Sequence, residues 1–129
     1  MLTLKNYYRV LIIDDDEDIR WSLKEILTPL HIKFEILEAS DALSGLKMFK
    51  EKKPDLIILD VQLPVANGIK VLDGIMKLNK AAKVIMITGM ERSKIVSSTK
   101  GMGARNYILK PFDHHAVKKI VYEVLNQQW

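Results

Sequence analysis

The sequence predicts an α/β fold built on a five-stranded, doubly wound parallel sheet of the (βα)5 type. Short runs rich in Val, Ile and Leu alternate with segments of helical periodicity along the chain. The strongest runs are apolar on both faces, as expected for strands that lie between two layers of helices. At 129 residues, the chain has the length of one ordinary domain. Right-handed crossovers between successive strands then give a single sheet covered on both sides.

Each expected element has its own signal in the sequence. Apolar runs predict strands over residues 10–13, 34–39, 56–59, 84–87 and 107–109. Apolar residues at helical spacing predict helices over residues 19–30, 42–49, 71–76, 91–100 and 117–125. Pro29 and the segment after it close the first helix, Ser40 is the expected N-cap of the second, and Asn67-Gly68 turns the chain into the third.

The strength of the helical pattern differs between these segments. The apolar face predicted for the second helix consists of Ala42, Leu43, Leu46 and Phe49. The fourth helix, from about Glu91 to Lys100, contains Ser97, Ser98 and Thr99, which are poor helix formers. We therefore expect the fourth helix to be the element that moves most readily.

The composition excludes several classes of site. The chain has no cysteine, which rules out disulfides, thiolate zinc sites and thiol nucleophiles, and which favours a reducing compartment. The first ten residues lack the apolar stretch of a secretion signal, and no apolar run approaches the roughly 18 residues of a membrane span. We therefore expect a cytoplasmic protein without membrane association.

Chemically active side chains stand at the ends of four predicted strands. Asp14 and Asp15 follow the first strand, Asp60 the third, Thr88 the fourth and Lys110 the fifth. The carboxyl ends of parallel strands open on one edge of the sheet, so these groups converge. Neighbouring carboxylates repel one another unless a cation neutralises them, and carboxylate and water oxygens are the ligands that Mg²⁺ prefers. The sequence therefore predicts a magnesium site at this edge.

These residues also have ordinary structural interpretations. An acid run at a helix start complements the helix dipole, and for residues 14–18 taken alone this explanation is as good as a metal site. Asp16 is better placed to cap the helix than to bind a metal. A charged residue directly after a strongly apolar strand is harder to explain structurally, and both Asp60 and Lys110 are such residues. Their joint occurrence with Thr88 at successive strand ends favours a functional site.

These motifs make the chain similar to the receiver domain of two-component response regulators, over residues 9–127. The matching segments are VLIIDDDEDIR with Asp14 and Asp15, PDLIILDVQLP with Asp60, VIMITG with Thr88, and YILKPF with Lys110 and Pro111. They occur in the family's order at compatible spacing, which makes the match specific. The resemblance implies one receiver domain over residues 1–129, with the flavodoxin-like strand order 2-1-3-4-5.

The resemblance assigns a role to each residue of the acidic site. Asp60 is the phosphorylation site, which accepts a phosphoryl group from a histidine kinase or a histidine phosphotransferase and forms an acyl phosphate. Asp15 and Asp60 bind Mg²⁺ directly, with Mn²⁺ as an alternative ion, and Asp14 acts largely through water. The backbone carbonyl of Gln62 completes the protein ligands.

Other positions are expected to respond to the phosphoryl group. By resemblance, Lys110 pairs with its oxygens, Thr88 swings its hydroxyl toward it, and the ring of Tyr107 turns inward when Thr88 moves. The bond between Lys110 and Pro111 matches a cis peptide in the family. A half-buried strand tyrosine and an ordinary trans bond are the structural alternatives.

The resemblance also implies two groups of residues around the site. The residues that meet the kinase or phosphotransferase are Asp18, Ile19, Ser22, Pro111 and Phe112. Ordinary core packing explains Ile19 equally well. Gln62 and Met90 flank the site and tune the lifetime of the acyl phosphate, and the apolar side chain of Met90 is expected to shield it from water.

The expected function is a phosphorylation-dependent switch rather than an enzyme acting on an external substrate. The domain assists only its own phosphotransfer and dephosphorylation. Its readout is the face of the fourth helix, fifth strand and fifth helix, which also offers a homodimer interface on phosphorylation.

A magnesium-dependent phosphohydrolase with an aspartyl phosphate is an alternative function, but the second acid that it needs is replaced by Gln62. A receiver-like module that works without phosphorylation is another, and the intact acid, threonine and lysine set argues against it.

The charge balance is the remaining feature of the sequence. The net charge of +4 and the isoelectric point near 9.2 would ordinarily indicate an acidic partner. Six of the 16 acids, however, belong to residues 14–18 and 60, and outside the site 19 basic residues face 10 acidic ones. We therefore expect no direct nucleic-acid binding by this domain. A solvated lysine surface is the favoured interpretation, and an acidic partner near the fourth helix is the alternative.

Overall fold

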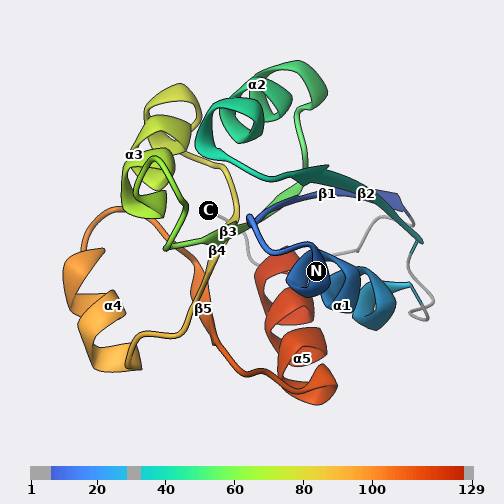
Figure 1. The fold of residues 1–129 in the computed structure, drawn as a ribbon. Helices are drawn as coiled ribbons and strands as arrows, with labels where there is room; N and C mark the ends of the chain where they lie inside the picture. Colours follow the sequence, from blue (N-terminus) through green and yellow to red (C-terminus); the bar gives the residue numbers. More distant parts are fainter. Residues whose placement is uncertain (1–6, 29–32, 127–129) are drawn as a thin grey trace.

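Five parallel strands form one central sheet with helices on both of its faces (Figure 1). The computed structural model describes residues 7–28 and 33–126. The strand order is β2-β1-β3-β4-β5, and every neighbouring pair is parallel. Each strand is therefore joined to the next by a crossover that contains a helix. These observations confirm the predicted fold class and the predicted strand order.

Strands and helices alternate along the described chain. The strands are β1 (Tyr7–Ile13), β2 (Lys33–Ala39), β3 (Leu56–Asp60), β4 (Val84–Thr88) and β5 (Asn106–Leu109). The helices are α1 (Glu17–Leu27), α2 (Ala42–Lys52), α3 (Gly68–Leu78), α4 (Arg92–Ser98) and α5 (His114–Leu125). Residues 29 and 30, where the first helix was predicted to end, lie outside the described residues, as does residue 127.

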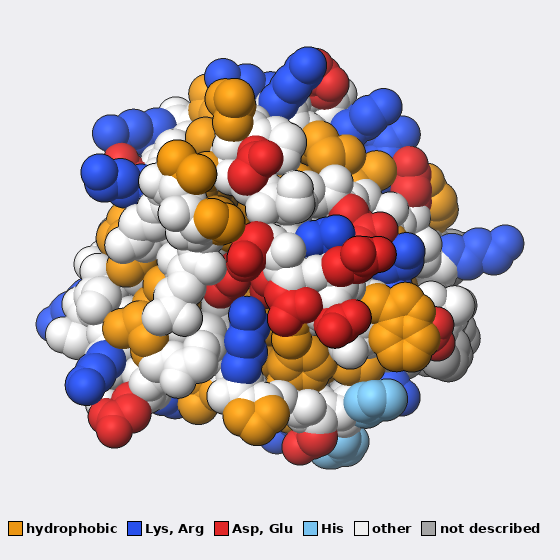
Figure 2. Space-filling view, viewed as in Figure 1, with side chains coloured by type: hydrophobic (Ala, Val, Ile, Leu, Met, Phe, Trp, Pro, Cys, Tyr) orange, Lys and Arg blue, Asp and Glu red, His pale blue; other side chains and the backbone are white. Residues whose placement is uncertain are grey.

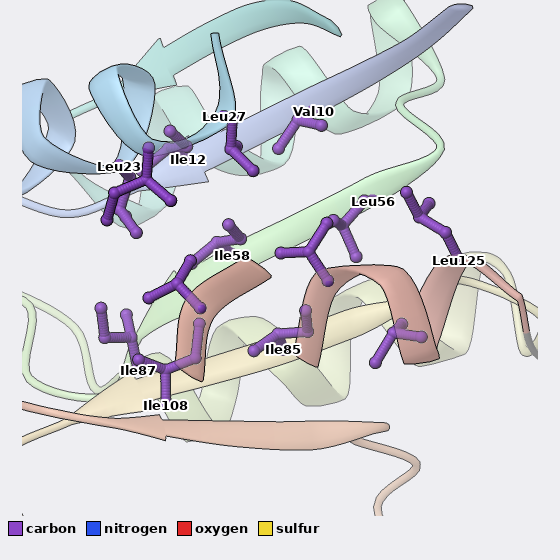
Figure 3. Packing of buried hydrophobic residues seen from close by; sticks show 14 of the residues in the cluster. Val10, Ile12, Leu23, Leu27, Leu56, Ile58, Ile85, Ile87, Ile108 and Leu125 are labelled. Carbon is purple, nitrogen blue, oxygen red and sulfur yellow. The ribbon is translucent and has the colours of Figure 1, made fainter. Parts of the chain in front are cut away.

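Two hydrophobic cores cover the two faces of the sheet. Successive strand residues point to opposite sides, so Val10 and Ile12 pack with α1 and α5 on one face (Figure 3). Leu11 and Ile13 pack on the other face with α2, α3 and α4. All residues of β3 and β4 are buried, which explains why these strands are apolar on both sides. The buried strands fix the positions of the residues at their ends.

The second helix differs from its prediction in two respects. Its N-cap is Asp41 rather than Ser40, and the Asp41 carboxylate accepts a hydrogen bond from the backbone N–H of Ser44 at 2.8 Å. Serine and aspartate are about equally good N-caps, so the sequence alone did not choose between adjacent residues. Leu43, predicted on the apolar face, is 81% exposed. The inward stripe runs through residues 42, 45, 46 and 49, at the three- and four-residue spacing of one helix face.

The fourth helix is shorter than the predicted residues 91–100. It spans seven residues, and its N-cap Glu91 makes no side-chain capping hydrogen bond. Ile95 is buried, whereas Val96 is exposed. This matches the expected weakness of the element, because serine-rich sequence contributes little intrinsic helix stability. Within the described ranges, no helix combines the length and the apolar character needed to cross a membrane.

Candidate functional site

The residues singled out at the strand ends all lie at the carboxyl edge of the sheet. Asp14 and Asp15 directly follow β1, Asp60 ends β3, Thr88 ends β4, and Lys110 directly follows β5. The backbone fixes the last two relative to each other, because Lys110 N donates to Thr88 O at 2.7 Å. Figure 2 shows acidic side chains gathered near the middle of one face of the molecule, with basic side chains among them. Parallel pairing therefore assembles the site from four separate strands.

Three carboxylates form an acidic cluster, made of Asp14, Asp15 and Asp60. One oxygen from each carboxylate lies within 4.8 Å of the other two. Asp14 is fully buried and Asp60 is only 2% exposed, whereas Asp15 is exposed. The acidic cluster therefore opens to solvent on the side of Asp15.

Lys110 contacts both buried carboxylates of the cluster. Its Nζ atom lies 3.1 Å from Oδ2 of Asp14 and 3.5 Å from Oδ2 of Asp60. The lysine side chain is itself one-quarter exposed. A single ammonium group does not neutralise three carboxylates, so the ionised cluster keeps a net negative charge.

The charge of Asp60 is electrostatically unfavourable. Burial raises the pKa of this carboxyl from its ordinary value of 3.8 to about 6, because the ionised form loses its water. The N–H of Gln62 donates to Oδ1 of Asp60 at 3.1 Å and lowers the pKa. The carboxylate of Asp14 raises it again, and the ammonium of Lys110 lowers it. Additional positive charge at this position would stabilise the ionised form.

The donor set fits a divalent cation. Oδ2 of Asp14 is buried and accepts no hydrogen bond from any described residue, although it faces Lys110. Oδ1 of Asp14, by contrast, accepts from Asp16 N at 2.9 Å. Three carboxylates on a cluster that opens to water match the habits of Mg²⁺, which keeps several water ligands. The same hard oxygen donors also suit Mn²⁺.

Thr88 and Met90 connect the site to the segment that follows β4. The side chain of Thr88 is fully buried, and its hydroxyl oxygen accepts a hydrogen bond from Met90 N at 3.0 Å. Met90 is half-buried and shares a cavity of about 500 Å³ with Gln62. The structure therefore brings together the two residues expected to flank the phosphorylated aspartate.

Tyr107 joins β5 to the fourth helix. Its hydroxyl shares a hydrogen bond of 2.6 Å with Oγ1 of Thr99, the C-cap residue of α4. The Arg92 guanidinium at the start of α4 lies 5.6 Å from the centroid of the tyrosine ring. Tyr107 therefore contacts both ends of the helix that the sequence analysis found weak.

Arg20 is a supporting residue that the sequence analysis missed. Its Nη1 atom donates to the backbone carbonyl of Asp14 at 2.7 Å, and its Nε donates to Glu38 at 3.0 Å. Lys24 binds the second oxygen of the Glu38 carboxylate at 3.1 Å. The guanidinium fixes the peptide between the two acids at the end of β1. The helical position of Arg20 was visible in the sequence, but its partner on β2 was not.

Gly68 is a second residue whose importance only the structure reveals. A Cβ atom at this position would lie 2.0 Å from the backbone oxygen of Asp60 and 2.8 Å from Cα of Val61. The N–H of Gly68 donates to the carbonyl of Val61 at 2.8 Å. Glycine is therefore required where α3 begins, because the helix start lies directly against the backbone of Asp60 and Val61. The Asn67-Gly68 pair signalled a turn but not this close approach.

The remaining predicted residues lie on the two elements next to the acidic cluster. The peptide bond between Lys110 and Pro111 is cis. Ile19 and Phe112 are half-buried against the same hydrophobic core, on α1 and before α5. Asp18 and Pro111 are exposed, and Ser22 is half-buried. The five residues expected to meet a kinase thus come from α1 and the loop between β5 and α5.

A buried aspartate in an acidic pocket, at the carboxyl edge of a (βα)5 sheet, defines the receiver class of signalling domains. The sequence matches the response regulator receiver domain over residues 10–122, and the chain belongs to this family.

Known proteins of this family cover nearly the whole chain. Protein CcdB of Bacillus subtilis is 37% identical over 117 residues, covering 91% of this chain and 97% of that protein. The chemotaxis protein CheY of Thermotoga maritima is 34% identical over 117 residues, covering 90% and 96% respectively. The solved receiver domain of NtrX from Brucella abortus superposes with a TM-score of 0.84 at 30% identity, covering 92% of this chain and 99% of that one.

The chain is therefore a receiver domain of CheY-like response regulators and a phosphoacceptor in two-component signalling. Receiver domains of response regulators interact with histidine kinases and hold Mg²⁺ in an acidic pocket.

Proposed function

We propose that Asp60 accepts the phosphoryl group from the phosphohistidine of a kinase or phosphotransferase, in a reaction that needs Mg²⁺ or Mn²⁺. The observation that carries this proposal is the acidic cluster with Lys110 at its side. An oxygen of Asp60 forms the new bond to phosphorus as the bond from phosphorus to the histidine nitrogen breaks. Such a transfer needs alignment and charge neutralisation more than covalent assistance.

Asp15 and Asp60 are the proposed direct metal ligands, with the backbone carbonyl of Gln62 as the third. Asp14 acts mainly through metal-bound water. The bound cation would neutralise charge on the carboxylates and on the transferred group. The hydrogen bond from Gln62 N restrains Oδ1 of Asp60. Oδ2 faces Lys110, whose ammonium would pair with phosphoryl oxygens.

The proposed response to phosphorylation runs from Thr88 to α4. The hydroxyl of Thr88 would exchange its hydrogen bond with Met90 N for a contact with the phosphoryl group. Tyr107 and α4 would then change position together, because the Tyr107 hydroxyl is bonded to Thr99. Phosphorylation would thus shift an existing equilibrium between two arrangements of the α4, β5 and α5 face, including its capacity to form a homodimer.

Three further assignments belong to this proposal. Asp18, Ile19, Ser22, Pro111 and Phe112 form the contact surface for the phosphodonor protein. Gln62 and Met90 tune the lifetime of the acyl phosphate, since both line the cavity between the loop after β3 and the α4 segment. The domain functions in the cytoplasm as one receiver unit and turns over no substrate beyond its own acyl phosphate.

The test is labelling by a small phosphodonor such as acetyl phosphate. We expect incorporation that requires Mg²⁺ and disappears in Asp60→Asn. Asp73→Asn is the matched control, because Asp73 is an exposed acid on α3 that pairs with Lys77. Equal labelling of the parent and Asp60→Asn would overturn the assignment of the phosphorylated residue. Labelling that is unaffected by chelation of the metal would overturn the proposed metal dependence.

A further inference from the structure

We propose that the cavity between the ends of α2 and α3 is a second interaction surface, which binds an acidic peptide segment of a partner protein through an apolar anchor side chain. This cavity, called the α2–α3 groove below, has a volume of about 400 Å³. Its lining residues are Phe49, Lys50, Lys53, Pro54, Leu78 and Asn79.

The α2–α3 groove lies at the end of the sheet opposite to the acidic cluster. Pro54 lines the groove just before β3 begins, whereas Asp60 ends that strand. The length of β3, at roughly 3.3 Å per residue, separates them by about 15 Å. A partner in the groove would therefore leave the phosphoacceptor edge open to a kinase.

The floor and one wall of the groove are apolar. Phe49 is buried to 7% exposure beneath it, and Pro54 is half-buried at its side. Leu78, the last residue of α3, remains 52% exposed at the rim. The volume lies near the lower end of the roughly 300–1,000 Å³ typical of ligand pockets, which is enough for an anchoring side chain. An apolar anchor in this space would cover Leu78.

The rim of the groove carries positive charge on its α2 side. Residues 47–53 include four lysines and a single acid, Glu51. Lys50 and Lys53 line the groove itself, and neither pairs with a carboxylate in the described part of the chain. An occupant with carboxylates on either side of its apolar anchor therefore matches the groove in charge.

The backbone of Lys53 supports a role for its side chain. Lys53 ends α2 in the left-handed conformation, with a φ of 48°. Glycine adopts this conformation without the steric penalty of a Cβ atom and is the usual residue at such a helix end. The fold alone would favour glycine here. A lysine held in this conformation places an ammonium group at the rim of the groove.

The groove suits a peptide better than a nucleic acid. Non-specific binding of single-stranded nucleic acid combines basic residues with exposed aromatic rings on which bases stack. The exposed apolar residue here is aliphatic, and the one aromatic ring in the lining, that of Phe49, is buried. A segment with an aliphatic anchor and flanking glutamates fits both the shape and the charge.

The probe for this proposal is a short synthetic peptide in which glutamates flank a single leucine. Titration into the ¹⁵N-labelled protein should shift the amide resonances of residues 49–53 and 78–80. The same peptide with glutamine in place of glutamate, and an oligothymidylate of equal charge, should produce no saturable shifts there. Saturable binding of the oligothymidylate at these residues would instead identify a nucleic-acid site and overturn the proposal.

Three variants separate binding from folding. Lys50→Gln combined with Lys53→Gln should weaken peptide binding by roughly tenfold, the loss expected for two rim ion pairs. Lys119→Gln on α5 is the matched control, because Lys119 is exposed on the other side of the sheet. Lys53→Gly should raise the urea midpoint of unfolding and still weaken binding, a combination that a purely structural lysine would not give.

Two outcomes overturn the proposal directly. One is equal peptide affinity of the parent and the Lys50→Gln/Lys53→Gln variant, and the other is the absence of peptide-induced shifts in the parent. Acetyl phosphate labelling of Asp60 is measured in the same variants and should be unchanged. Failure of the groove proposal is thereby distinguished from failure of the proposed phosphorylation site.

Discussion

At the scale of single residues, the buried carboxylate of Asp60 destabilises the folded protein. Its carboxylate is buried, lies beside Asp14 and is only partly compensated by Lys110. Above its raised pKa, the folded protein must keep a charge that the unfolded chain would solvate freely. The proposed phosphoacceptor is therefore also a source of instability when no cation is bound.

The variant Asp60→Asn should be more stable than the parent in the absence of divalent metal. The carboxyl ionises near 3.8 when unfolded and near 6 when folded. Below pH 3.8 the carboxyl is protonated in both states, and the folded protein carries no buried charge. As the pH rises through 6, the folded carboxyl loses its proton, and the stability that this proton provided is lost. The gain from Asp60→Asn is therefore about 3 kcal/mol near neutral pH and falls to about 0.5 kcal/mol near pH 4. Urea unfolding of both proteins at the two pH values measures it. A gain that is equal at both would contradict this explanation.

Gly68 allows the start of α3 to lie against the backbone of Asp60, the proposed phosphoacceptor. Gly68→Ala should destabilise the fold by about 3 kcal/mol, because its Cβ would meet the backbone of Asp60 at 2.0 Å. Gly74→Ala in the same helix is the control, since its Cβ would lie in ordinary contact with Leu46 at 3.5 Å. That change should stabilise α3 by about 0.5–1 kcal/mol. Thermal or urea unfolding checks both values, and equal effects would refute the assigned close approach.

At the scale of elements, α4 depends on its neighbours more than on its own sequence. Its N-cap makes no side-chain hydrogen bond, Ile95 is its one buried residue, and Thr99 binds Tyr107 on β5. Its two ends are thus connected to a strand whose tyrosine is the expected switch residue. A helix held mainly by tertiary contacts changes position when those contacts change.

Thr99→Val should loosen this helix. The substitution keeps the shape of a buried side chain but removes the hydrogen bonds of the Thr99 hydroxyl with the Tyr107 hydroxyl and with Ile95 O, so we expect a loss of about 1–2 kcal/mol. Amide hydrogen exchange should accelerate in α4 and at Tyr107. Ser98→Ala is the matched control, because the exposed Ser98 hydroxyl bonds only within the helix, to Lys94 O. If the two variants exchange alike, the Thr99–Tyr107 bond does not hold α4 in place.

At the scale of the whole molecule, metal binding and folding are linked through the acidic cluster. The cluster exists only when β1 and β3 are paired, so a cation that binds it stabilises the folded state. A bound cation would offset both the burial and the carboxylate repulsion that make the charge of Asp60 unfavourable.

Addition of Mg²⁺ should therefore raise the free energy of unfolding. At a concentration of about 100 times the dissociation constant, the expected gain is about 2.7 kcal/mol. Asp15→Asn removes a proposed direct ligand and should lose most of this gain. Glu17→Gln should retain it, because Glu17 is an exposed acid near the site but outside the cluster. Thermal unfolding with and without Mg²⁺ tests both variants, and an equal response would show that general screening is responsible.

Most of the fold could be predicted because its signals are local. Apolar runs identified all five strands, and helical periodicity identified all five helices, since burial on both faces leaves a clear pattern. The errors were local as well. Ser40 and Asp41 are nearly equivalent caps, and the exposure of Leu43 follows from the exact rotation of α2 on the sheet. Small shifts of register are not encoded in composition.

The sequence by itself determined the fold class, the strand-end residues of the site and the family to which the chain belongs. Strand ends at the same edge of a parallel sheet bring Asp14, Asp60 and Lys110 together whatever the details of packing. Only the tertiary structure decided which side chains support them, because the contacts of Arg20 with Glu38 and of Gly68 with Asp60 join segments distant in the chain. The tertiary structure also decided where the lysines gather. The net charge follows from the sequence alone, because it is a sum over residues, whereas the position of each charge depends on the folded surface.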